Sequence, residues 1–123
     1  MRFMIQLWSD EHALPDTQLV AAMVSYNDAL SRAGVLLAAE GLLSSSRGAR
    51  ISMSAGQREL SHGPFHEALG VCVGFWLLRV RSRAEALECT KRCPLSERDV
   101  LELRELYGVP DLTLAEPLEA LML

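Results

Sequence analysis

The alternation of apolar and polar positions changes several times along the chain, and each change marks an expected element. Alternate apolar positions from Phe3 to Leu7, with Trp8 on the opposite set, predict a strand with both faces at least partly covered. A helical spacing follows, with Asp16 or Thr17 as N-cap and Gly34 at its C-terminal end. The apolar face of this helix consists of Leu19, Met23, Tyr26, Leu30 and Ala33.

The rest of the pattern predicts three more sheet segments, one hairpin and one helix. The hairpin alternates around Ile51 and Met53 and turns at Ala55-Gly56. Ser82 and Glu85 form a capping box in front of the second helix. The other expected ranges are the strands Val35–Ala39, Val71–Val80 and Val100–Tyr107 and the helix Arg83–Arg92.

The order of these elements predicts an α+β fold of the ferredoxin-like sandwich type, β-α-β-β-α-β, with the hairpin as an insertion. Two helices cover one face of such a sheet. The first strand and residues 71–80 are apolar on both sides, so the other face needs cover as well. We expect a second copy of the chain to supply it, which gives a homodimer that resembles a dimeric α+β barrel.

Composition fits one domain over residues 1–123, with residues 111–123 as a C-terminal tail whose end, Leu118–Leu123, is apolar. The net charge of -4 is mixed along the chain, which argues against nucleic acid or a membrane as partner. The longest apolar stretch, Val71–Leu78, is far shorter than the ~20 residues of a membrane span. A cytoplasmic protein with its three cysteines reduced is therefore expected.

One short segment combines two imidazoles with a carboxylate. His62 and His66 flank the Gly63-Pro64 turn, and Glu67 follows directly. A histidine oriented by a carboxylate is a general base near neutral pH, so His62 with Glu40 or Glu67 is a candidate catalytic pair. The alternative is a turn with both imidazoles in solvent.

The sequence gives less support to a metal site at this segment. Two histidines and a carboxylate suit a metal, but the Gly-Pro turn disfavours the helix that would aim both at one ion. No metal and no cofactor is therefore expected. The residues considered as walls of a small-molecule pocket are Asp10, His66, Phe65, Trp8 and Trp76.

The chain resembles the YCII-related proteins, in the branch called DGPF-domain proteins. Four segments carry the resemblance: Arg2–Glu11, Ala33–Leu42, His62–Phe65, and Gly74–Trp76 with Ser82, Glu85, Ala86 and Lys91–Pro94. His62 stands where that branch has aspartate in Asp-Gly-Pro-Phe, and Ala68, Leu69 and Gly70 replace further polar residues of the motif.

The resemblance implies a dimeric ferredoxin-like fold and leaves the activity open, because most members of the branch have no established one. Some wider relatives are enzymes on small ring compounds or carry a His–Asp pair, and some are encoded beside alternative sigma factors. Three hypotheses follow. The protein binds a small molecule in a pocket near His62 at the dimeric sheet; it is a lyase- or isomerase-like enzyme on a cyclic compound; or it is a non-catalytic dimeric interaction or regulatory module.

Overall fold

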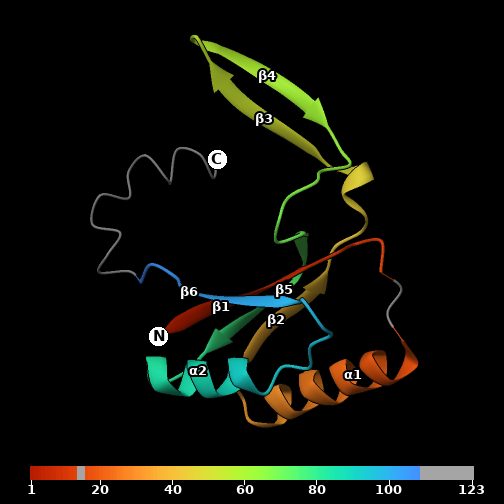
Figure 1. Ribbon diagram of the computed structural model, residues 1–123. Coiled ribbons are helices and arrows are strands. Elements are labelled where there is room, and N and C mark those ends of the chain that lie inside the picture. Colours follow the sequence, from red (N-terminus) through yellow and green to blue (C-terminus); the bar gives the residue numbers. More distant parts are fainter. Residues whose placement is uncertain (14–15, 109–123) are drawn as a thin grey trace.

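A four-stranded antiparallel sheet with both helices on one face forms the body of the protein (Figure 1). The computed structural model describes residues 1–13 and 16–108. The sheet order is β2-β5-β1-β6, and a separate two-stranded sheet, β3-β4, stands apart from it. The elements are β1 (Arg2–Ser9), α1 (Thr17–Arg32), β2 (Leu36–Gly41), the 3-10 turn η1 (Ser45–Arg47), β3 (Ala49–Ser54), β4 (Gln57–His62), β5 (Val71–Arg79), α2 (Arg83–Lys91) and β6 (Val100–Glu105).

The strand order confirms the predicted ferredoxin-like fold. β1 and β5 lie in the centre, each hydrogen-bonded to an outer strand. The hairpin is confirmed as an excursion from the sheet. Several boundaries differ by one or two residues, and two of these shifts are the largest: β2 continues to Gly41, which places Glu40 inside the strand, and β6 ends at Glu105, before Tyr107. The predicted tail, residues 111–123, lies outside the described residues.

The core lies between the sheet and the helices. Phe3, Ile5 and Leu78 on the helix-facing side of the central strands are almost fully buried. Trp76 donates its indole N–H to Asn27 of α1 at 2.7 Å and meets the ring of Tyr26 edge-on. Of the predicted apolar face of α1, Tyr26 and Leu30 are buried and Leu19 and Met23 are partly buried, whereas Ala33, at the end of the helix, is exposed.

Both helices begin at the expected caps. Asp16 accepts a hydrogen bond from the N–H of Leu19, and Ser82 accepts one from the N–H of Glu85. Glu85 in turn accepts from the N–H of Arg81, which completes a variant of the predicted capping box. Among the described residues, neither helix is long and apolar enough to cross a bilayer.

Candidate functional site

Three connecting segments meet at the end of β1 and create the candidate site. They are the turn after β1, the 3-10 turn η1 and the loop from β4 to β5. The N–H and the hydroxyl of Ser45 both donate to the carboxylate of Glu11, and the Ser45 hydroxyl accepts from the N–H of Phe65 at 2.9 Å. Ser45 therefore holds the other two segments together.

Close backbone approach requires glycine at both ends of the β4–β5 loop. A Cβ on Gly63 would lie 1.7 Å from the carbonyl oxygen of Ser45. A Cβ on Gly70 would lie 2.1 Å from the carbonyl oxygen of Ser9, and the φ of Gly70 is +81°. No side chain fits in these spaces, so the two glycines press the loop against η1 and against the end of β1.

The same loop is anchored to the hairpin through Arg50. Its guanidinium forms an ion pair with Glu67 and lies over the ring of Phe65, 4.0 Å from the centroid. Both members of the ion pair are about half exposed, so the pair orients the loop more than it stabilises the fold. Together with Ser45, Arg50 fixes the loop on both sides of His66.

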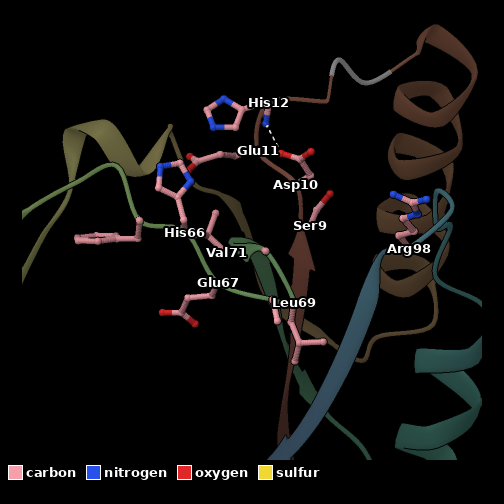
Figure 2. Close-up of a pocket in the computed structure, with 12 residues that line it drawn as sticks. Ser9, Asp10, Glu11, His12, His66, Glu67, Leu69, Val71 and Arg98 are labelled. Carbon is pink, nitrogen blue, oxygen red and sulfur yellow. Dashed lines mark hydrogen bonds between the residues drawn. The ribbon is translucent and has the colours of Figure 1, made fainter.

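The turn and the loop line a half-open cavity of about 280 Å³ (Figure 2). The rings of His12 and His66 stack across its upper part with centroids 6.2 Å apart. The lining is formed by Ser9, Asp10, Glu11, His12, Phe65, His66, Glu67, Ala68, Leu69, Gly70, Val71 and Arg98. Polar side chains of both charges thus surround a space that suits a small ligand.

Most of the carboxylates around the cavity already accept hydrogen bonds. The two Ser45 donors hold the pKa of Glu11 below its ordinary value of 4.5. Asp10 accepts from the N–H of His12 at 3.0 Å, and Glu67 is paired with Arg50. These contacts fix the positions of the acids, and within residues 1–13 and 16–108 the imidazoles of His12 and His66 have no hydrogen-bond partner.

Arg98 completes the lining from the segment that precedes β6. Its φ of +72° is rare for a residue with a side chain, and such conformations cluster at functional sites. The next residue, Asp99, accepts from the hydroxyl of Ser9 at 2.7 Å, which fixes this segment to the end of β1. Within residues 1–13 and 16–108, Arg98 has no ion-pair partner.

A larger space of about 700 Å³ lies behind the same turn, between α1 and the loops that follow β2 and α2. It shares Ser9, Asp10, Glu11 and Arg98 with the first cavity, and much of its remaining wall is aliphatic. Neither His12 nor His66 lines it. The smaller cavity is therefore the candidate site, because it alone of the two contains the imidazoles.

The structure brings together four of the residues singled out from the sequence. Asp10 comes from the turn after β1, while Phe65, His66 and Glu67 come from the β4–β5 loop, and all four line the cavity. Asp10 precedes Phe65 by 55 positions in the sequence, while Phe65, His66 and Glu67 are consecutive. Their convergence follows from the fold and from the Ser45 link.

The other predicted residues lie elsewhere. His62 is exposed at the end of β4, and its side chain has no hydrogen bond or ion pair within the described part of the chain. Glu40 is exposed on β2 and, with Trp76, borders a different space of about 220 Å³ between the sheet and α1. Trp8 is half-buried on β1, and within the described residues its indole N–H has no partner. The His62 pair with Glu40 or Glu67 stays a prediction, with Glu67 held by Arg50.

Two residues important to this geometry are absent from the candidates drawn from the sequence. The sequence does mark His12, as part of the polar turn Asp10–His12 that follows the first strand. Ser45 lies in a run of serines with nothing to mark one of them, and Arg98 lies in an ordinary polar loop. Across residues 1–13 and 16–108, no three His, Cys, Asp or Glu side chains are grouped so as to hold a metal ion.

Comparison with known protein families assigns the chain to a family. The profile of the YCII-related domain matches residues 1–109. Because this match covers most of the 123-residue chain, the protein belongs to the YCII-related family. A search of curated proteins finds no match to the chain.

Proposed function

We propose that this YCII-related protein binds a small organic acid in the cavity between His12 and His66. The observation that carries the proposal is the stacking of these two imidazoles across a cavity fixed by glycine contacts and by the Ser45 link. A pocket with a rigid backbone and a few convergent polar groups is the usual form of a small-ligand site.

The choice of an acid follows from which groups are free. The carboxylates of Glu11, Asp10 and Glu67 already accept from Ser45, His12 and Arg50 respectively. Within the described residues, the guanidinium of Arg98 and the two imidazoles form no hydrogen bonds through their side chains. A carboxylate suits the guanidinium, and a hydroxyl or carbonyl group on the same ligand suits an imidazole.

A binding screen with charge variants tests the proposal. Small hydroxy- and oxo-carboxylic acids are screened by thermal shift, and affinities are measured by calorimetry. Arg98→Asn removes the charge, and asparagine tolerates the positive φ. Arg83→Gln on the exposed start of α2 is the matched control.

We expect at least one acid to stabilise the protein, about tenfold weaker binding in Arg98→Asn, and unchanged binding in Arg83→Gln. Equal affinities in both variants would refute the role of Arg98. A screen without any binder would refute the ligand class.

A catalytic version of the same site is the second candidate, an acid–base lyase or isomerase on a cyclic acid. The observation that favours it is the pair of imidazoles lining one pocket together with Asp10, since histidine is a general base near pH 7. The sequence-based variant assigns the base to His62 with Glu40 or Glu67. Incubating the protein with a bound acid in D₂O distinguishes the two assignments of the base. If hydrogen–deuterium exchange on the acid is lost in His66→Gln, the base lies in the cavity. If the exchange is lost only in His62→Gln, His62 is the base. A bound acid that never exchanges refutes both.

A further inference from the structure

The space of about 700 Å³ behind the turn after β1 has a largely aliphatic wall that is open to solvent. Leu7 of β1 and Met23 of α1 line it at the edge of the core between the sheet and the helices. Val20, Leu42 and Leu43 also line it, and their side chains are 49%, 49% and 73% exposed. Aliphatic side chains gathered around one open space mark a groove for an apolar group.

The polar part of this wall adjoins the His12–His66 cavity. The two spaces share Ser9, Asp10, Glu11 and Arg98. The first three already form hydrogen bonds within the chain. Within residues 1–13 and 16–108, the guanidinium of Arg98 forms neither a hydrogen bond nor an ion pair. A cation without a partner therefore borders both the polar cavity and the aliphatic space.

The sizes of the two spaces indicate how a ligand would divide between them. Sites for small molecules usually measure about 300–1,000 Å³. The His12–His66 cavity, about 280 Å³, lies at the lower limit and is lined by both imidazoles, so it suits a polar head group. The larger space lies well within the usual range and is mostly aliphatic, so it suits an apolar chain. A ligand anchored at Arg98 reaches both.

We infer that the ligand is an amphipathic carboxylic acid whose aliphatic chain lies in the larger space. This inference rests on the acid site proposed above and specifies the class of acid. Arg98 binds the carboxylate where the two spaces adjoin, and a hydroxyl or carbonyl group beside it lies toward the imidazoles. The chain then lies between α1 and the segment after β2, against Met23 and Leu42. Full burial of one methylene group tightens binding about fourfold.

Acids of increasing chain length test the inference on the full chain. Calorimetry compares lactic, α-hydroxyhexanoic and α-hydroxydecanoic acid, each below its micelle concentration. Because the space is open on one side, we expect about a twofold gain for each methylene group, or about 100-fold over the series. Equal affinities of lactic and α-hydroxydecanoic acid, both dependent on Arg98, would leave the acid site standing and overturn the inference. The same result would follow if residues 109–123 or another protein filled the larger space.

Two leucine variants test where the chain lies. Leu42→Asn makes the wall of the larger space polar, while Leu60→Asn on the hairpin is the control, because Leu60 is 61% exposed and lines neither space. We expect Leu42→Asn to weaken α-hydroxydecanoic acid about fivefold more than lactic acid, and Leu60→Asn to weaken both equally or not at all. A gain with chain length that is the same in both variants places the chain elsewhere and overturns the inference.

The Arg98→Asn variant separates the inference from the acid site on which it rests. We expect this change to weaken acids of every length by the same factor, about tenfold, because it removes the anchor and leaves the aliphatic wall intact. If α-hydroxydecanoic acid binds equally well without Arg98, the chain binds on its own and the amphipathic arrangement is wrong. If no acid of any length binds, the proposed function fails together with the inference.

Discussion

Ser45 donates both its backbone N–H and its hydroxyl to the carboxylate of Glu11, and this contact joins η1 to the turn after β1. The Ser45 hydroxyl also accepts from Phe65, so one serine positions the loop that carries His66. The cavity walls are thus set by hydrogen bonds between connecting segments rather than by the sheet alone.

The contact between Glu11 and Ser45 predicts a stability that depends on acid pH. The Ser45 hydrogen bonds lower the pKa of Glu11 from 4.5 in the folded protein. Its contribution to folding is therefore complete above the unfolded value and is lost as pH falls through the lower, folded value. The free energy of unfolding, measured with urea, should fall less between about pH 6.5 and about pH 3.5 in Glu11→Gln than in the unmodified protein. Glu97→Gln, an exposed control, should lose as much unfolding free energy as the unmodified protein. Equal losses in the unmodified protein and both variants would contradict a stabilising contact between Glu11 and Ser45.

Gly70 should tolerate no side chain. In Gly70→Ala the new Cβ meets the carbonyl oxygen of Ser9 at 2.1 Å, and the φ is positive as well. Gly34→Ala is the matched control, because its φ of +73° is similar and no atom lies within 4 Å of the new Cβ. Chemical denaturation should show a loss of about 1 kcal/mol for the control and about 3 kcal/mol or more for Gly70→Ala. Similar losses would mean that the contact with Ser9 is unimportant.

Ala55 is in an unfavourable conformation for its type. Its φ of +50° together with +77° at Gly56 gives the hairpin a turn that favours Asn-Gly. Ala55→Asn should therefore stabilise the hairpin by about 1 kcal/mol. The hairpin is a separate two-stranded sheet, so we expect it to open independently of the body, and amide exchange across residues 51–60 measures its stability better than global unfolding does. Faster exchange in the variant would show that the turn has another shape.

The cysteines of the helical layer should react slowly in the native protein. Burial, with a smaller effect from Asp99, raises the pKa of Cys93 to about 12, and burial also raises the pKa of Cys89. Few thiolates are then present at neutral pH, and the thiolate is the reactive form. Mass spectrometry after brief alkylation should find Cys93 unmodified in native protein and modified in denaturant. Rapid modification of the native thiol would contradict the buried position.

The sequence predicts the fold well because periodicity reports burial directly. The helix-facing positions of β1 and the caps at Asp16 and Ser82 lie where the pattern puts them. The site is only partly predictable. The polar residues near His66 mark the loop as a candidate site. The stacking of His66 on His12, however, depends on Ser45, and the sequence does not show that η1 brings Ser45 to Glu11. The sequence favours His62 over His66 as the reactive histidine, yet His62 ends an exposed strand while His66 lines the cavity.

The proposal of a ligand site between His12 and His66 is tested most directly by NMR of the three histidines. With an acid identified by screening, the imidazole C–H signals of His12 and His66 should shift together on titration, while that of exposed His62 stays in place as an internal control. His66→Gln should weaken the binding about tenfold, and His62→Gln should leave it unchanged. Shifts confined to His62, or binding that survives intact in His66→Gln, would contradict the proposed site.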